Sequence, residues 1–347
     1  MLDQYKTIIV VGAGGWLGQA VVRGLLDGIT GRDDLAGVSE SVKIIAADLS
    51  SALTNIDSRE DRLEKIAMDV CDSTTFEKLN AYANNALIIH VVGIIHPKNV
   101  KQFFEINHEG SVNFLRHMAQ KGAKKAVVMS SNSPIGTNPY PEHVFDEKHE
   151  YNPYMGYGKS KMLLEKSLLN ETFSMEVVLI RAPWFYGVNQ PARQKEFFEM
   201  IRNGKGPIVG SGNNRRSMVF TENLAQGIFL AADKEGIDKE VFWVADERPY
   251  TMNTIIDTVE RLMDDEFGLQ CKHKRLRLPG LAAEVAYLID GVMQSMGLYH
   301  PKIHVLSEMN KTIACSIGKA KKELGYKPQV ALEEGMRQSL QELYGRQ

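Results

Sequence analysis

The segment TIIVVGAGGWLGQAVVRGLL, residues 7–26, constrains the fold more than any other part of the chain. Residues 7–11 have the unbroken apolar pattern of a buried strand, the next residues form a glycine-rich turn, and an amphipathic helical pattern follows. Gly12, Gly15 and Gly18 would let the main chain approach a pyrophosphate, and a helix start offers free N–H groups to bind it. The pattern favours a nucleotide site over a tight structural turn.

Further apolar runs alternate with helical patterns along the first half of the chain. Strands are expected at 42–48, 86–95, 126–131 and 175–183, and helices at 73–83, 101–121 and from Tyr157 onward. Such alternation indicates a parallel, doubly wound sheet that binds ligands at the carboxyl ends of its strands. The predicted fold class is therefore α/β, a Rossmann sheet with a smaller C-terminal mixed α/β substrate-binding region.

The length of 347 residues fits one large domain or two ordinary ones. Residues 1–183 are expected to form the dinucleotide-binding domain, to which later segments near 215–245 return. Residues 184–347 are expected to form mainly the substrate-binding region.

Asp48 ends the second expected strand. A carboxylate there can accept hydrogen bonds from the adenosine ribose and would repel a 2′-phosphate, which favours NAD over NADP. The loop at 28–41 makes the spacing from the glycine turn longer than the usual ~20 residues. An ordinary strand-end aspartate is the alternative, and NADP stays open.

Tyr157 and Lys161 are four residues apart in a segment with helical character, so their side chains share one face. A neighbouring ammonium favours the phenolate form of a tyrosine, which makes such a pair suitable for proton transfer with an alcohol or a carbonyl. Ser131, at the end of the strand at 126–131, is a candidate donor to the reacting oxygen.

Charge and cysteine content exclude several classes of protein. The net charge of −2 does not suggest a nucleic-acid partner, and three separated cysteines are typical of a reducing cytoplasm. No uncharged apolar run reaches the ~20 residues that a membrane span needs. We expect a cytoplasmic protein with a small-molecule substrate, assembled as a homodimer.

The segment 271–299 joins a basic cluster to an amphipathic helix. A helix of this kind either lies on a membrane surface, as a weak peripheral contact, or belongs to the substrate region with a solvated basic edge. His300, His304 and Cys315 lack a further ligand pair, so no metal is expected.

Several motifs occur together in one order: VVGAGGWLG, IIHVVG, INHEGSVNFL, VVMSSNSPIG, YGKSK, RAPWFYG and KAKKELGYKPQVALEEGM. With Asp48 and Asp69-Val70, they make the chain resemble the extended short-chain dehydrogenase/reductases of the NAD-dependent epimerase/dehydratase type. The C-terminal part is similar to the 3β-hydroxysteroid dehydrogenase branch.

The resemblance implies Tyr157 as catalytic acid/base, Lys161 as ligand of the nicotinamide ribose and Ser131 as the polarising hydroxyl. It implies that the three glycines hold the pyrophosphate, Asp48 the adenosine ribose, and Asp69 and Val70 the adenine. The remaining predicted cofactor contacts are Trp16, Leu17, Val92, Gly93, Asn107 and Pro183.

The predicted substrate contacts are Asn132, Trp184, Phe185 and Arg216. Many nucleotide-sugar members have asparagine where this chain has Trp184, whereas Arg216 matches the arginine that contacts the diphosphate in those enzymes. The aromatic run Trp184 to Tyr186 forms either a pocket wall or core.

Three functions follow from these residues. The leading prediction is an NAD(P)-dependent oxidoreductase that interconverts a secondary alcohol and a ketone. The alternative is a nucleotide-sugar epimerase or dehydratase-type enzyme, which Arg216 supports and Trp184 disfavours. A non-catalytic dinucleotide-sensing protein is the third, although Ser131, Tyr157 and Lys161 are all present.

Overall fold

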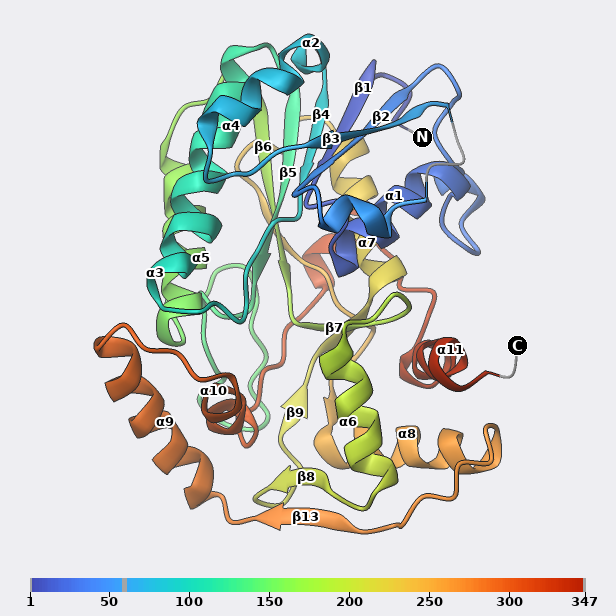
Figure 1. Cartoon of the computed structure of the whole chain (residues 1–347), viewed down its shortest axis with the longest axis vertical. Helices are drawn as coiled ribbons and strands as arrows, with labels where there is room; N and C mark the ends of the chain where they lie inside the picture. Colours follow the sequence, from blue (N-terminus) through green and yellow to red (C-terminus); the bar gives the residue numbers. More distant parts are fainter. Residues whose placement is uncertain (1, 58–60, 346–347) are drawn as a thin grey trace.

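The computed structural model describes residues 2–57 and 61–345, and its centre is a seven-stranded parallel sheet (Figure 1). The strand order is β11-β6-β5-β4-β1-β2-β3. The strands are β1 Thr7–Val11, β2 Lys43–Asp48, β3 Leu63–Ala67, β4 Leu87–His90, β5 Lys125–Ser131, β6 Glu176–Ala182 and β11 Val241–Trp243. This arrangement confirms the predicted doubly wound α/β fold.

Helices cover both faces of the sheet, which explains why its central strands are continuously apolar (Figure 1). Ile8 and Val10 of β1 pack in one cluster with α1 (Trp16–Asp27) and α7 (Thr221–Asp233). Ile9 and Val11 point to the other cluster, with α4 (Ser111–Gln120) and α5 (Met155–Asn170). The alternation of side chains along a strand therefore divides one apolar run between two cores.

The chain leaves the sheet at the end of β6 and builds a second region, drawn in the lower half of Figure 1. Three two-stranded sheets, β10-β7, β12-β9 and β13-β8, combine there with helices. The elements are β7 Trp184–Tyr186, α6 Ala192–Arg202, β8 Gly206–Val209, β9 Arg215–Arg216, β10 Met218–Phe220, β12 Tyr250–Thr251, α8 Met252–Asp265, β13 Arg275–Leu278, α9 Leu281–Ser295, α10 Pro301–Glu308 and α11 Leu332–Tyr344. The division of the chain at residue 183 stays a prediction.

Several elements differ from the sequence expectations. Strand β3 was not expected, because its partly exposed Glu64 and Lys65 break the apolar pattern at the edge of the sheet. Residues 73–83 form a 3₁₀ helix, η3 (Ser73–Leu79), followed by the short α2 (Asn80–Ala83). The helix expected at 101–121 is α3 (Lys101–Phe104), a π-helical turn η4 (Glu105–Gly110) and then α4.

Candidate active site

Ser131 and Tyr157 meet at the carboxyl end of β5. A hydrogen bond between their side chains lowers the pKa of Tyr157, but burial outweighs it and raises that pKa to about 12. Without a ligand, the phenol is therefore neutral at physiological pH. Ser131 Oγ also lies 3.4 Å from Ser133 Oγ, a neighbour that sequence reasoning did not single out.

Lys161 lies one turn further along α5 and is buried. Its Nζ donates to the main-chain oxygens of Met129 at 3.0 Å and Val92 at 3.3 Å. Burial lowers the pKa of Lys161 to about 8, against the attraction of Glu165. Burial is the largest cause of the raised pKa of Tyr157, and the phenolate-favouring effect expected of this ammonium stays a prediction.

A buried ion pair fixes α5 against the sheet. Arg181 Nη2 of β6 lies 2.6 Å from Glu165 Oε2, and Ser130 Oγ of β5 donates to Glu165 Oε1 at 2.5 Å. Sequence reasoning missed this network, although Glu165 follows Lys161 by four residues on the same helix. The network holds the helix that carries Tyr157 and Lys161.

The glycine turn follows β1, which pairs with β4 where the strand order of the sheet reverses, the position at which doubly wound sheets bind ligands. Gly12 has φ +88°, and a Cβ there would lie 3.0 Å from the Val92 nitrogen. A Cβ on Gly18 would lie 2.0 Å from the Gly12 oxygen. Gly15, at the start of α1, has no side chain that could cap the helix. The turn fits a pyrophosphate.

Asp48 lies against this turn. Its Oδ2 accepts from the Gly14 nitrogen at 2.9 Å, and its Oδ1 accepts from the Leu49 nitrogen at 2.7 Å. Burial raises its pKa, and these hydrogen bonds oppose the rise. Gly14 was not predicted as a site residue, although a Cβ there would lie 2.1 Å from the Ala52 oxygen.

The other predicted cofactor residues follow the neighbouring strands. Asp69 and Val70 come after β3, where Asp69 Oδ1 accepts from the Cys71 nitrogen at 2.8 Å. Asn107 is buried and bonds Ile94 through both its amide atoms, at 2.8 and 3.0 Å, which orders the segment after Gly93. Pro183 directly follows β6. Leu17 is buried in the cluster beneath the turn. These roles stay predictions.

Trp16 links the glycine turn to the second region. Its Nε1 donates to the Val188 oxygen at 2.8 Å, and its ring lies 5.1 Å from the Phe185 ring. The guanidinium of Arg193 lies 5.8 Å from the Trp16 ring. Phe185 therefore faces the start of α1 in this structure.

The aromatic run after β6 is mostly packed against protein. The Trp184 ring lies 5.7 Å from Phe197 of α6, and Tyr186 is fully buried and donates to Asp246 at 2.7 Å. A pocket wall of three aromatics is thus wrong for Tyr186. Burial raises the pKa of Asp246 to about 7, and sequence reasoning missed this carboxyl.

Arg216 enters the site from β9. Its Nη1 donates to the Glu308 oxygen at 3.2 Å, and burial lowers its pKa, opposed by the charges of Glu308 and Tyr154. The charge of Glu308 also raises the pKa of Tyr157. Glu308 therefore lies near both groups, although it is distant from them in sequence and was not predicted. Asn132, next to Ser131, bonds the Ala182 oxygen through its main chain at 3.2 Å.

The histidine predicted to be structural is part of a buried pair. His304 Nδ1 lies 2.7 Å from Asp290 Oδ2, and this hydrogen bond raises the pKa of His304 against the effect of burial. Among the described residues, no group of three or more His, Cys, Asp or Glu side chains could hold a metal.

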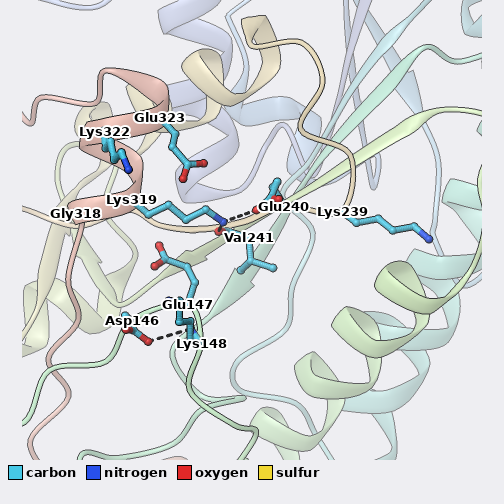
Figure 2. Close-up of a pocket in the computed structure, with 10 residues that line it drawn as sticks. All are labelled: Asp146, Glu147, Lys148, Lys239, Glu240, Val241, Gly318, Lys319, Lys322 and Glu323. Carbon is cyan, nitrogen blue, oxygen red and sulfur yellow. Dashed lines mark hydrogen bonds and ion pairs between the residues drawn. The ribbon is translucent and has the colours of Figure 1, made fainter.

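Two surface cavities lie apart from the predicted catalytic residues, and one of them reaches the predicted cofactor residues Gly15 and Trp16. One of about 490 Å³ is bordered by the glycine turn, Asn189, Gln190 and Glu342. The other, of about 480 Å³, lies beside β11 and is lined mostly by charged residues, among which Lys319 lies 2.5 Å from Glu240 (Figure 2). None of the predicted catalytic residues lines either cavity.

The profile of the family described as "NAD dependent epimerase/dehydratase" matches residues 8–245, from β1 to just beyond β11. The chain belongs to the NAD-dependent epimerase/dehydratase family. This membership confirms the family resemblance and agrees with the prediction of NAD. It also favours the sugar-modifying alternative over a general alcohol dehydrogenase.

The chain is 47% identical over 339 residues to the uncharacterized protein y4nL of Sinorhizobium fredii, covering 96% of this chain and 94% of that protein. It is 25% identical over 345 residues to UDP-glucose 4-epimerase of Vibrio cholerae, covering 97% and 95% of the two chains.

The fold of this chain is shared with solved structures. The dTDP-glucose 4,6-dehydratase of Bacillus anthracis, in complex with NAD, superposes with a TM-score of 0.74 at 18% identity, covering 97% and 96% of the two chains. The UDP-glucose 4-epimerase of Thermotoga maritima, solved with UDP-glucose, gives 0.72 at 20% identity, covering 97% and 98%.

Proposed function

We propose that this protein is an NAD-dependent nucleotide-sugar epimerase or dehydratase-type enzyme. When bound, NAD supplies the acceptor for a hydride taken from a secondary alcohol of the sugar. Tyr157 would remove the hydroxyl proton, Ser131 would hold the reacting oxygen, and Lys161 would bind the nicotinamide ribose. The close-packed turn at Gly12 and the carboxylate of Asp48 fit such a cofactor.

The observation that carries the choice of substrate is the half-buried guanidinium of Arg216. The hydrogen bonds described for it go to main-chain oxygens of Glu308 and Lys311, and burial lowers its pKa, so an anionic ligand would stabilise its charge. A sugar nucleotide brings a diphosphate. The similarity to UDP-glucose 4-epimerase over nearly the whole chain supports the same substrate class.

The leading prediction from sequence, an NAD(P)-dependent oxidoreductase that interconverts a secondary alcohol and a ketone, has less support than the alternative. Trp184 disfavoured the nucleotide-sugar alternative in the sequence, but in the structure its ring packs against Phe197. Trp184 is partly buried against the core of the second region, so its replacement of the usual asparagine does not by itself create an apolar substrate wall.

The test is a substrate panel with the purified enzyme and NAD. UDP- and dTDP-sugars are compared with hydroxysteroids and cyclic alcohols, with mass spectrometry and NMR for sugar products and absorbance for net NADH. We expect conversion of at least one nucleotide sugar. Net NADH formation with an apolar alcohol alone would contradict the proposal.

Two variants separate the roles of the residues. Tyr157→Phe should lower turnover by roughly 10²–10⁴-fold and leave NAD affinity nearly unchanged, because it removes the acid/base hydroxyl alone.

Arg216→Gln should raise KM for the nucleotide sugar. The neighbouring Arg215→Gln serves as control, since Arg215 donates to the main-chain oxygens of Pro141 and His143. Equal effects of both arginine variants would remove Arg216 from the substrate site.

A further inference from the structure

The outer face of α9 carries an apolar surface that the described part of the chain leaves exposed. At 100° per residue, six exposed apolar side chains of this helix and its end fall within an arc of about 100°. They are Leu281, Val285, Leu288, Ile289, Val292 and Met296. Leu281 exposes 71% and Leu288 68% of its surface, values typical of side chains that lack a packing partner.

This exposure is concentrated in one place. Of the fourteen large apolar residues exposed in the described part of the chain, ten lie between residues 276 and 305. The segment also lies beyond residue 245, where the family match ends. Contiguous apolar patches on a protein surface mark interaction sites. The surface is thus a feature of this chain that the family match does not explain.

The inner face of α9 combines two buried alanines, Ala283 and Ala286, with polar side chains that form specific hydrogen bonds. Asp290 pairs with His304 at 2.7 Å, and Gln294 Oε1 accepts from the Gly156 nitrogen at 2.9 Å. The Tyr287 ring lies 5.5 Å from the Tyr154 ring. These contacts fix the rotation of α9 about its own axis, so that its exposed apolar side chains face away from the protein. They also connect α9 to the start of α5, next to Tyr157.

Exposed basic residues lie on the elements before and after α9. Lys272, Lys274 and Arg277 are exposed on and beside β13, which runs along the lower edge of the molecule into α9 (Figure 1). Lys302 is exposed on α10, and none of these four cations forms an ion pair with a described residue. The exposed acid of α9, Glu284, is paired with Lys311.

The charges decide which partner fits. In a symmetric contact between two copies, the same patch lies on both sides, so the basic rim would face a surface without complementary acids. Anionic lipid headgroups complement lysine and arginine, and the acyl boundary accepts apolar side chains of an interfacial helix. No helix of the described residues is long and apolar enough to cross a membrane.

We propose that α9 and β13 dock this enzyme on the surface of a membrane that contains anionic lipid. The helix lies in the interfacial plane, with its six apolar side chains at the acyl boundary and the basic residues at the headgroups. Through the contact between Gln294 and Gly156, the docked helix lies beside the catalytic segment. This proposal does not depend on the reaction that the enzyme catalyses.

The experiment is co-sedimentation of the full chain with vesicles of phosphatidylcholine alone or mixed with phosphatidylglycerol. We expect binding to the mixed vesicles. Leu281→Glu/Leu288→Glu should weaken it at least tenfold by removing apolar burial. Its matched control is Val144→Glu/Met200→Glu, two exposed apolar residues elsewhere on the surface.

A second variant, Lys272→Gln/Lys274→Gln/Arg277→Gln, tests the basic residues. It should weaken binding to the mixed vesicles roughly a hundredfold, since each cation near an anionic surface contributes about fivefold. Its matched control replaces three exposed lysines at the opposite end of the sheet, Lys6, Lys121 and Lys234, by glutamine. Circular dichroism and NAD titration confirm that each variant is folded.

Three outcomes would overturn the proposal. The parent protein would fail to bind mixed vesicles, or the α9 variant would bind as tightly as its control. In the third, light scattering would show a dimeric parent that does not bind vesicles and an α9 variant that is monomeric. The apolar face would then be an interface between copies of this chain.

Discussion

At the scale of single residues, burial decides the protonation states in the candidate site. The pKa of Tyr157 is raised to about 12 and that of Lys161 is lowered to about 8, so burial favours the neutral form of both. A cationic nicotinamide beside the phenol would favour its ionised form. The ligand-free site is therefore not yet set for proton removal, and cofactor binding would complete it.

Asp48 should determine the choice of cofactor. Its carboxylate is held at the glycine turn by the Gly14 and Leu49 nitrogens, where a 2′-phosphate would meet a negative charge. We expect NAD to bind more tightly than NADP, and Asp48→Asn to reduce the ratio of the two affinities about tenfold or more, which corresponds to ~1.4 kcal/mol. Calorimetric titration measures both, with the exposed Asp27→Asn as control. Tighter NADP binding by the parent would contradict the assignment.

Asp246 should make stability depend on pH. Its pKa rises from 3.8 to about 7 on folding, chiefly by burial, so the folded state holds the proton more tightly than the unfolded state. The stabilisation is complete below the unfolded pKa and is lost as pH rises through the folded one. Between pH 4 and 7 the parent should lose a few kcal/mol of unfolding free energy relative to Asp246→Asn.

Denaturant unfolding of the parent and Asp246→Asn across this pH range tests the assignment. Asp233→Asn, at the exposed end of α7, is the control. Parallel pH profiles for the parent and Asp246→Asn would show that this carboxyl has an ordinary pKa.

At the scale of elements, the contact between α1 and the turn before it sets the cofactor cradle. A Cβ on Gly18 would lie 2.0 Å from the Gly12 oxygen and 2.5 Å from the Ala13 oxygen. Both atoms belong to the main chain, so the turn itself would have to move. The packing of helix on turn leaves no room for any larger residue at this position.

Gly18→Ala should lower NAD affinity at least tenfold and lower the melting temperature, because the displaced turn no longer fits the pyrophosphate. Gly280→Ala is the matched control: the residue has φ −54°, and no atom lies within 4 Å of its Cβ position. This control should be neutral or slightly stabilising, by up to ~1 kcal/mol. NAD affinity of Gly18→Ala equal to that of the control would show that the cradle lies elsewhere.

At the scale of the whole molecule, the sheet and the second region are interlocked. The chain passes between them after β6 and again between β10 and α7, and β11 returns to the edge of the sheet. Asp246, directly after β11, accepts from Tyr186 and from the Phe220 nitrogen, and so binds β7 and β10. Separate unfolding of the two regions would break these buried contacts.

We therefore expect a single thermal transition that shifts upward with NAD. At a free concentration of 100 times Kd, a ligand of the folded state stabilises it by ~2.7 kcal/mol. Scanning calorimetry with and without NAD measures the shift. Two transitions, of which only one responds to NAD, would instead show independent domains divided near residue 183.

The sequence by itself determined the elements that local patterns encode. Apolar runs and glycines predicted β1, β2 and the turn between β1 and α1, and four-residue spacing placed Tyr157 and Lys161 on one helical face. These features depend on neighbouring residues alone, since strand burial, turn geometry and helical periodicity are short-range.

The tertiary structure alone decided which distant surfaces meet. It brought Glu308 near Tyr157 and Arg216, packed Trp184 on Phe197, and paired the unexpected β3 with β2. It also turned the large apolar side chains of α9 outward, while Asp290 and two alanines face the protein, unlike the usual amphipathic helix. Such contacts depend on three-dimensional packing between segments far apart in the chain, which no local pattern records.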